Sequence, residues 1–271
     1  MGVLNVTPDS FSDGGLWFSA ENAIRHAEGL IEQGADIVDI GGESTRPGSK
    51  PVSDAEELRR IMPVIETLVS RNICVSVDTS KPEVMRASIE AGVSMINDVK
   101  ALQAPGALEA VAEGGAFACL MHMQGEPRSM QTNPRYGNVV TEVKDFLWRR
   151  VETAQAAGIP LERLVIDPGF GFGKTLEHNI ELLRHLDSFL DIGVPLMVGL
   201  SRKSMLGKIT GNEVGDRIHA SIAAALLALM KGARIFRVHD VKASRDAIAV
   251  YNAISGSQCD KITVVNRLSS D

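Results

Sequence analysis

The sequence predicts an α/β protein built as a single-domain TIM (β/α)8 barrel, and three observations support this fold class. Eight short apolar runs alternate with helix-like segments along 271 residues. Most of these runs are followed by a turn rich in glycine, proline or serine. Alternating strands and helices are typical of parallel sheets with right-handed crossovers. Eight such units favour a barrel over a doubly wound open sheet, so we expect one domain over residues 1–271.

The expected strands all end in a polar or charged residue. These endings are Leu4-Asn5, Val38-Asp39, Val77-Asp78, Ile96-Asn97, Met121-His122, Ile166-Asp167, Leu200-Ser201 and Phe236-Arg237. A barrel collects the carboxyl ends of its strands at one mouth, where these side chains would line a single pocket. The hydrophobic core needs none of them, which makes them the first candidates for chemistry.

The segments between the runs carry helix signals. Ser19 is the expected N-cap of a helix that ends before Gly34, and residues 53–56 (Ser-Asp-Ala-Glu) form a capping-box pattern. Pro82 is placed at the first turn of a third helix. Further helices are expected over 105–113, 139–157, 176–186, 213–231 and 241–254. The long connections 7–18, 41–52, 124–138 and 201–212 all follow strands, so we expect them to be loops over the mouth.

Composition and charge exclude several classes of protein. The net charge is −6 with a pI near 5.6, which argues against a broad nucleic-acid surface but allows a local cationic pocket. The three cysteines show no metal-binding spacing, and their odd number argues against a disulfide framework. The longest aliphatic block, 218–230, is too short and alanine-rich to span a membrane. We therefore expect a cytoplasmic protein without membrane or nucleic-acid partners.

Strand alternation sharpens the expected pocket. Successive side chains of a strand point to opposite faces, so small and polar residues can share the barrel interior while valine and isoleucine face the helices. The residues predicted to point inward are Cys74, Ser76 and Asp78 in one strand and Ile235, Arg237 and His239 in another. Asp78, Asn97 and Asp167 would form a polar floor, against the simpler interpretation that they are internal hydrogen-bonding residues.

The glycine-rich stretch 167–175 resembles a nucleotide-binding loop but fits neither common pattern. A P-loop needs a glycine where this chain has Pro168, and the third glycine of a dinucleotide-binding turn would fall on Lys174. The glycines instead suggest close backbone approach to a flat ligand, with Phe172 packing nearby. His122 has no accompanying serine or cysteine nucleophile pattern, so a hydrolase triad is unsupported.

Cations at the same mouth point to an anionic ligand. Arg46, Lys203, Arg237 and His239 all follow expected strands, and TIM barrels often bind phosphate after strands 7 and 8. Asn5, with aspartates in the first loop, could ligate a hard cation that bridges such phosphates.

At these residues the chain resembles the dihydropteroate synthases of folate biosynthesis. The matching stretches are residues 4–15, 41–48, 77–82, 96–98, 121–124, 167–172, 201–204 and 237–240, which follow the family's order along nearly the whole chain. The resemblance implies a TIM-barrel transferase that joins 7,8-dihydropterin-6-ylmethyl diphosphate to 4-aminobenzoate and releases diphosphate. It also implies a Mg²⁺ cofactor, sulfonamides as inhibitors and a homodimer.

Residue roles carried over from the resemblance divide the mouth into four parts. The pterin would be bound by Asp78, Asn97, Met121, Asp167, Phe172 and Lys203. The diphosphate would be bound by Arg46, Arg237 and His239, with Mg²⁺ held by Asn5. The 4-aminobenzoate site would comprise Phe11, Thr45, Arg46, Pro47 and Ser204. The expected catalytic residues are Asp78, Asp167, Lys203 and Arg237.

The implied mechanism is a substitution in which diphosphate departs and the arylamine attacks the pterin methylene, whose cationic character Asp78 and Asp167 offset. Two alternatives remain at this point. A methyltetrahydrofolate methyltransferase domain would share the pterin-binding residues but would not need the diphosphate cations or the motif 43–47. A catalytically silent pterin- or drug-binding protein would be expected to lose Thr45, Lys203 or Arg237, and all three are present.

Overall fold

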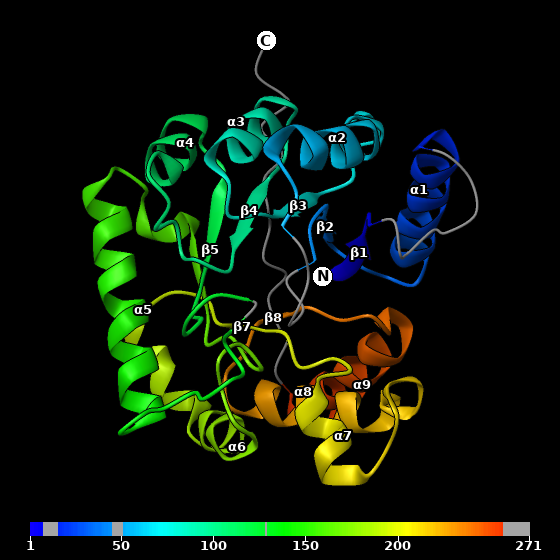
Figure 1. Ribbon diagram of the computed structural model, residues 1–271. Helices are drawn as coiled ribbons and strands as arrows, with labels where there is room; N and C mark the ends of the chain where they lie inside the picture. Colours follow the sequence, from blue (N-terminus) through cyan, green and yellow to red (C-terminus); the bar gives the residue numbers. More distant parts are fainter. Residues whose placement is uncertain (8–15, 45–50, 128, 257–271) are drawn as a thin grey trace.

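The computed structural model describes residues 1–7, 16–44, 51–127 and 129–256, and parallel strands ringed by helices make up its architecture (Figure 1). Six strands form one parallel sheet in sequence order, and two more form a second parallel pair. The strands are β1 (Gly2–Asn5), β2 (Val38–Gly41), β3 (Val75–Asp78), β4 (Met95–Asp98), β5 (Phe117–Met121), β6 (Leu164–Asp167), β7 (Met197–Val198) and β8 (Ile235–Phe236).

Two single bridges close these sheets into a barrel. Ile166 pairs with Leu196 between β6 and β7, and Gly2 pairs with Val238 beside β8. Backbone hydrogen bonds support both junctions, from Ile166 N to the Pro195 carbonyl at 3.0 Å and from Val3 N to the Val238 carbonyl at 3.1 Å. The predicted α/β barrel is therefore confirmed.

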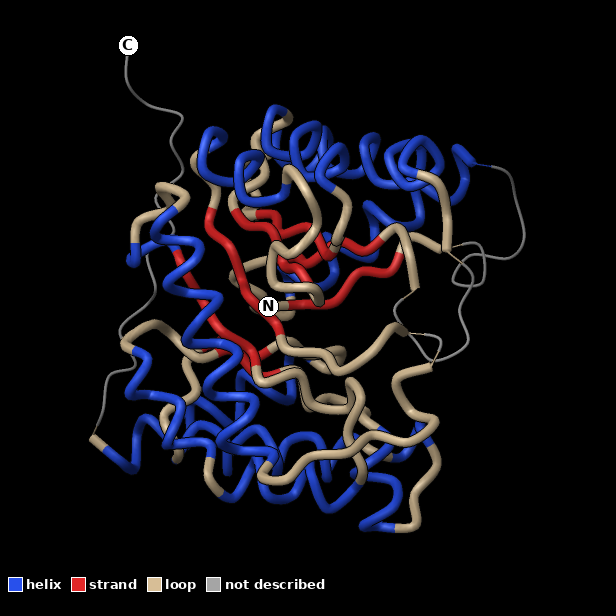
Figure 2. The backbone as a smooth tube through the Cα atoms, turned by 60° about the vertical axis from the view of Figure 1, so that its left-hand side comes forward, coloured by secondary structure: helices blue, strands red, loops and turns tan. Residues whose placement is uncertain are grey.

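Helices cover the outside of the strands, as the tube view also shows (Figure 2). They are α1 (Leu16–Glu32), α2 (Asp54–Ser70), α3 (Pro82–Glu90), α4 (Ala107–Gly114), α5 (Val139–Ala156), α6 (Leu176–Arg184), α7 (Ser204–Thr210), α8 (Ile218–Met230) and α9 (Val241–Ser255). Short 3-10 turns span Leu161–Arg163, Leu186–Ile192 and Val214–Asp216. The helix starts follow local chemistry: Ser53 caps α2 by accepting a hydrogen bond from Glu56 N at 3.2 Å, and Pro82 opens α3.

Strand alternation separates two apolar layers. Val75 and Val77 belong to the large core between strands and helices. A smaller cluster fills the barrel interior and contains Met95, Cys119, Val165, Met197 and Ile235, one from each of β4 to β8. The residues two positions further along the chain point in the same inward direction. They are Asn97, Met121, Asp167, Gly199 and Arg237. The interior apolar layer thus supports a polar layer at the carboxyl end.

Three details differ from the sequence-based expectations. Strand β2 continues to Gly41, so Asp39 lies inside the strand and not at its end. Helix α1 begins at Leu16, which places Ser19 within the helix and not at its N-cap. The connection 201–212 contains helix α7, which was expected to be loop; it is only seven residues long and its polar flanks conceal it.

Candidate functional site

The polar floor is assembled by parallel strand register. Asn5 pairs with Gly41, Gly41 with Asp78 and Asp78 with Asn97, so β1 to β4 bring these residues to one level of the barrel. Asp167 ends β6 opposite Met121 of β5. The structure therefore brings together the three residues predicted for the floor, although 89 positions separate the first from the last.

Arg237, which follows β8, extends into the mouth and joins two carboxylates, one on β2 and one on β3. Its Nε donates to Asp39 Oδ2 at 2.6 Å, and its Nη2 donates to Asp78 Oδ2 at 2.9 Å. Asn97 Nδ2 donates to the same Asp39 oxygen at 3.3 Å. Burial alone would lower the pKa of Arg237, but the Asp39 and Asp78 carboxylates raise it, so the guanidinium stays charged. Asp39 was among the polar strand-end candidates but had no assigned role, because a lone aspartate in a strand carries no motif.

The floor carboxylates resist ionisation. Burial raises the pKa of Asp78 to about 7; Arg237 opposes this shift and the neighbouring Asp39 carboxylate adds to it. Burial also raises the pKa of Asp167, while the hydrogen bond from Gly169 N to its Oδ1, at 2.7 Å, favours the ionised form. A positively charged or N–H-rich ligand would favour the ionised form of both groups, because that form accepts its hydrogen bonds.

Lys203 lies beside this floor, at the end of the turn after β7. Its Nζ is 4.2 Å from the centroid of the Phe172 ring, a cation–π contact. Burial lowers the pKa of Lys203 to about 8, and the Arg237 charge adds to that effect. Met121 is buried at the end of β5. The carboxylates are therefore adjoined by an apolar side chain (Met121), an aromatic ring (Phe172) and an amine that titrates near pH 8 (Lys203).

The glycine-rich turn after β6 approaches protein backbone more closely than any side chain would allow. A Cβ on Gly169, which has φ +70°, would lie 1.8 Å from the His122 carbonyl oxygen. A Cβ on Gly173 would lie 2.4 Å from the Gln124 carbonyl oxygen. Glycine at these two positions therefore allows the turn to pack against the loop after β5. The expected approach to a flat ligand stays a prediction.

His239 and Ser204 occupy the outer part of the mouth. The His239 backbone N and ring Nδ1 each lie 3.1 Å from Ser201 Oγ, which fixes the turn after β8 to the turn after β7. Ser204 is the exposed first residue of α7. Arg202, with φ +58°, forms a two-pronged ion pair with Asp240 that holds the same two turns together. The turns after β7 and β8, which carry Lys203, Arg237 and His239, are therefore linked to each other by hydrogen bonds and an ion pair.

Asn5 is the residue predicted to hold a divalent cation. It ends β1, is half-buried, and its Oδ1 lies 3.8 Å from the point where a Cβ on Gly41 would be. Among the described residues, no group of three or more histidine, cysteine or acidic side chains could hold a metal ion. A single amide oxygen suits Mg²⁺ only where phosphate oxygens and water complete the coordination. The residues present fit an ion that arrives with its phosphate ligand.

A buried ion-pair cluster fixes both ends of the second loop. Lys81 Nζ contacts Glu43 Oε2 at 2.6 Å, the Val52 carbonyl at 2.7 Å and Glu57 Oε2 at 2.7 Å. Burial raises the pKa of Glu57, an effect that its hydrogen bond from Lys81 opposes. Glu43 and Val52 flank residues 45–50, so one ammonium group connects both described ends of that loop. This cluster was not predicted from the sequence, where Lys81 entered only as part of the matching stretch 77–82.

Four predicted residues cannot be placed. Phe11, Thr45, Arg46 and Pro47 lie outside the described residues. The other predicted residues lie at the same mouth, either in the last two positions of a barrel strand or after its end. They are Asn5, Asp78, Asn97, Met121, Asp167, Phe172, Lys203, Ser204, Arg237 and His239.

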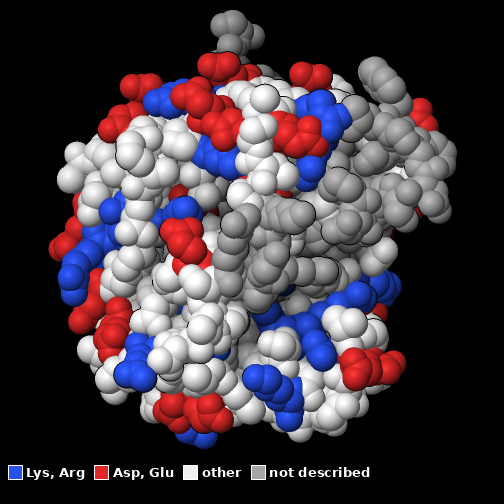
Figure 3. Space-filling view, in the orientation of Figure 1, with Lys and Arg blue, Asp and Glu red and all other residues white. Residues whose placement is uncertain are grey.

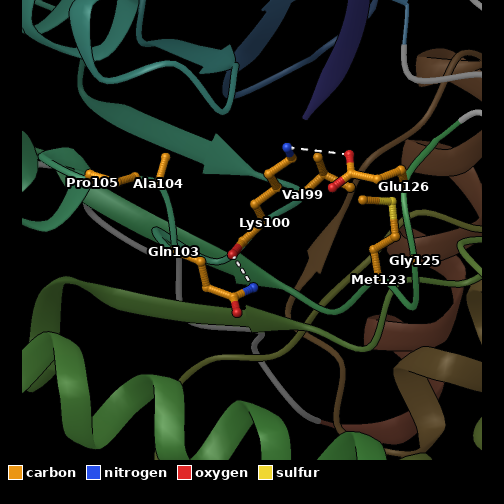
Figure 4. Close-up of a pocket in the computed structure, with 8 residues that line it drawn as sticks. All are labelled: Val99, Lys100, Gln103, Ala104, Pro105, Met123, Gly125 and Glu126. Carbon is orange, nitrogen blue, oxygen red and sulfur yellow. Dashed lines mark hydrogen bonds and ion pairs between the residues drawn. The ribbon is translucent and has the colours of Figure 1, made fainter.

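A separate hollow of about 350 Å³ lies between the loops that follow β4 and β5 (Figure 4). Its lining consists of Val99, Lys100, Gln103, Ala104, Pro105, Met123, Gly125 and Glu126. Lys100 and Glu126 form an ion pair across it at 3.4 Å. None of the predicted site residues lines this hollow, so it is distinct from the polar floor.

The surface offers two further observations. Basic and acidic side chains are interspersed over the face drawn in Figure 3, and a group of basic ones borders the grey atoms above α7 and α9. Across the described ranges, every helix is too short or too polar to traverse a lipid bilayer.

Comparison with known proteins gives consistent matches. Residues 1–239 match the family described as pterin binding enzyme. A dihydropteroate synthase of Escherichia coli K12 is 50% identical over 262 residues, covering 96% of this chain and 93% of the relative. A Yersinia pestis dihydropteroate synthase solved with a sulfonamide drug superposes with a TM-score of 0.90 at 48% identity, covering 95% and 94% of the two chains. The Xanthomonas albilineans dihydropteroate synthase solved with 7,8-dihydropteroate superposes with a TM-score of 0.86 at 50% identity, covering 95% of this chain and 94% of the other.

Proposed function

The chain belongs to the dihydropteroate synthases of the pterin-binding enzyme family, and on this premise we propose how its residues carry out the reaction. The reaction joins 7,8-dihydropterin-6-ylmethyl diphosphate to 4-aminobenzoate and yields 7,8-dihydropteroate and diphosphate. The observation that carries the proposal is that the acidic floor and the cations lie next to each other at one mouth of the barrel. Asp78, Asp167 and Asn97 lie beside Lys203 and Arg237, so a ring rich in N–H groups and a diphosphate can bind side by side.

The pterin ring would lie on the floor of the mouth. Its amino and ring N–H groups would donate to the carboxylates of Asp78 and Asp167, and Asn97 offers both a donor and an acceptor. Lys203 would donate to the ring carbonyl, and its contact with Phe172 keeps its ammonium group over the site. Met121 would pack on the ring face. Burial of these polar groups makes each matched hydrogen bond stronger than it would be in water.

The diphosphate would bind to the cations at the edge formed after β7 and β8. Arg237 offers a planar guanidinium, and His239 is held next to it by Ser201. Arg46 and the 4-aminobenzoate residues Phe11, Thr45 and Pro47 belong to the same proposal, with Ser204 at the start of α7. Asn5 would hold Mg²⁺ together with diphosphate oxygens, and the ion would neutralise charge on the leaving group when bound.

The chemical step would be a substitution at the pterin methylene carbon. Its bond to the diphosphate oxygen breaks, and a bond to the nitrogen of 4-aminobenzoate forms. That nitrogen then passes one proton to the departing diphosphate or to water. Arg237 stabilises the departing anion, and the Asp78 and Asp167 carboxylates stabilise the cationic pterin. No protein nucleophile takes part in this step, since the arylamine nitrogen itself attacks the carbon.

The test is diphosphate release measured with both substrates, with each substrate alone, and with or without Mg²⁺. We expect release and dihydropteroate formation only with both substrates and the metal. Tight pterin binding without any dihydropteroate would contradict the reaction and favour a silent binding protein. Methyl transfer from a reduced folate would favour the methyltransferase alternative.

The proposal extends to a homodimer in the cytoplasm. Helices α8 and α9 pack against each other and carry large exposed apolar side chains, among them Met230 at 66% and Ile254 at 82% exposure. Exposed apolar faces of this kind are typical of subunit contacts. Cys74 and Cys119 are free thiols, the form that the reducing cytoplasm maintains. Light scattering should give twice the chain mass for the wild type and a lower value for Met230→Lys.

A further inference from the structure

Asp39 occupies an unusual place for a charged residue. It lies inside β2 and is fully buried, with 0% of its surface exposed. Carboxylates are rarely buried unless a cation pairs with them, because burial costs the hydration of the charge. Here the partner is Arg237, which is 198 positions away in the sequence. The chain therefore retains a buried ion pair across its barrel.

Two carboxylates hold the guanidinium of Arg237 through different nitrogens. Asp39 accepts from Nε at 2.6 Å, and Asp78 accepts from Nη2 at 2.9 Å. These contacts come from adjacent strands, β2 and β3, so they fix both the position and the plane of the group. The remaining Nη1 has no hydrogen bond to any residue that the structure describes. It is the nitrogen left over for a ligand.

Depth separates the roles of the two carboxylates. The side chain of Asp78 is 10% exposed and that of Arg237 is 22% exposed, whereas Asp39 is fully covered. A ligand that enters the mouth can therefore contact Arg237 and Asp78, while Asp39 acts only through its neighbours. We propose that Asp39 is a positioning residue: it fixes the guanidinium of Arg237 where that group binds the diphosphate. This role rests on the function proposed above.

The same carboxylate oxygen also ties the anion site to the floor. Asn97 Nδ2 donates to Asp39 Oδ2 at 3.3 Å, a longer bond than the one from Arg237. Both bonds have the ionised carboxylate as acceptor, but only the bond from Arg237 joins two opposite charges. Loss of the Asp39 charge should therefore disturb Arg237 far more than it disturbs Asn97.

Asp39→Asn keeps the volume of the side chain but removes its charge. The guanidinium then has one ionised partner, Asp78, and is drawn toward it. Binding should be measured by calorimetry, in the presence of Mg²⁺, with dihydropterin-methyl diphosphate and with the corresponding hydroxymethyl-dihydropterin, which lacks phosphates. We expect at least about a 30-fold loss of affinity for the diphosphate, the lower range for breaking a buried charge pair, and less than about threefold for the phosphate-free pterin.

A double-variant cycle tests whether the effect passes through Arg237. In an Arg237→Gln background, addition of Asp39→Asn should change the diphosphate affinity by less than about threefold, because the coupled partner is already absent. Ser76→Ala is the matched control: Ser76 is the buried register neighbour of Asp39 on β3 and should leave both affinities unchanged. If Asp39→Asn does not fold, Asp39→Glu replaces it: the charge is kept but displaced by one methylene, and the loss should again be selective for the diphosphate. The Asp39→Asn, Arg237→Gln double variant, which removes both charges, is then compared with Arg237→Gln alone.

Equal losses for the two ligands, or independent losses in the double variant, would overturn the role of Asp39. The binding measurement requires no turnover. A wild-type protein that binds the diphosphate but forms no dihydropteroate would therefore contradict the proposed reaction and leave the role of Asp39 supported by its own data.

Discussion

The Nζ atom of Lys174 lies 2.9 Å from His122 Nδ1, deep behind the polar floor. The same ammonium group contacts the carbonyl oxygens of Gly169 at 2.9 Å and Phe172 at 3.0 Å. Lys174 is 3% exposed, and burial lowers its pKa to about 7. Burial, assisted by the Lys174 charge, also lowers the pKa of His122 to about 3, so the imidazole is neutral and its Nδ1 accepts. One lysine thus fastens the turn after β6 to the end of β5.

Lys174→Met should destabilise the protein by about 2–4 kcal/mol, because the carbonyls of His122, Gly169 and Phe172 and one imidazole nitrogen lose their donor. Urea denaturation followed by circular dichroism measures this change. Combining Lys174→Met with His122→Phe, which preserves packing on Phe146, should cost less than the sum of the two single changes. Strict additivity would show that the two residues do not act as a pair.

The pH dependence of kcat/KM should report the floor. Asp78 has a raised pKa of about 7, so its ionised and functional form grows as pH rises through 7. Lys203 has a lowered pKa of about 8, so its charged form is lost as pH rises through 8. We expect a narrow bell between these values in a steady-state pH series. In Asp78→Asn the residual activity should lack the acidic limb that belongs to Asp78, while ionisation of the substrate diphosphate remains in both proteins.

Ionisation of Asp78 should raise activity but lower the free energy of unfolding. A carboxyl group whose pKa rises on folding binds more protons in the folded state between pH 4 and 7. Its contribution to the free energy of unfolding therefore falls as pH rises through this window. Wild type should lose stability relative to Asp78→Asn between pH 4 and 7 in urea titrations. A difference that is independent of pH would contradict the raised pKa.

Most of the fold could be predicted from the sequence, because strand ends and helix caps are local signals. Ser53 and Pro82 mark helix starts that the structure confirms. The polar floor could be anticipated too, since alternation and parallel register determine which side chains point inward. Helix α7 could not, because seven residues give too little periodicity to distinguish a helix from a loop.

The buried charge network is the part that sequence reasoning could not supply. Asp39, Lys81 and Lys174 each pair with groups that only the closed barrel brings near, and none of them belongs to a local pattern of chemistry. The glycines after β6 show the same limitation. The sequence indicated close backbone approach there, but it did not indicate that the backbone of His122 and Gln124 lies against Gly169 and Gly173.

Lys81 provides a test of how the second loop is held. Lys81→Met removes the group that joins Glu43 to the Val52 carbonyl, and it leaves the buried Glu57 without a cation. We expect the KM for 4-aminobenzoate to rise about tenfold, because loss of an ionic anchor of this kind costs about 1.4 kcal/mol or more. The KM for the pterin diphosphate should change little. Steady-state kinetics with each substrate varied in turn makes the comparison.

Lys81→Arg is the matched control, since it keeps the charge and can still bridge two carboxylates. It should restore most of the affinity for 4-aminobenzoate. An equal rise in both KM values for Lys81→Met would indicate general damage to the barrel and would contradict a specific role for the ends of this loop.

Sulfonamides should inhibit this protein in competition with 4-aminobenzoate. The prediction is motivated by the motifs 8–15 and 45–47 in the sequence and by the Yersinia pestis relative solved with a sulfonamide drug. A sulfonamide carries the same arylamine ring as the substrate, with a sulfonyl group where the carboxylate would be. Competition therefore raises the apparent KM for 4-aminobenzoate in proportion to drug concentration, while kcat stays constant. Steady-state rates over a matrix of drug and substrate concentrations measure this pattern.

The control ligand is the same drug acetylated on its aryl nitrogen, which blocks the amine that faces the pterin methylene in the proposed reaction. If the arylamine must enter the same site as the substrate, acetylation should remove inhibition, because the amide is bulkier and lacks a free lone pair. A normal rate in drug excess at low 4-aminobenzoate would contradict the prediction. Inhibition that a higher concentration of pterin diphosphate relieves would instead place the drug on the floor formed by Asp78, Asn97 and Asp167.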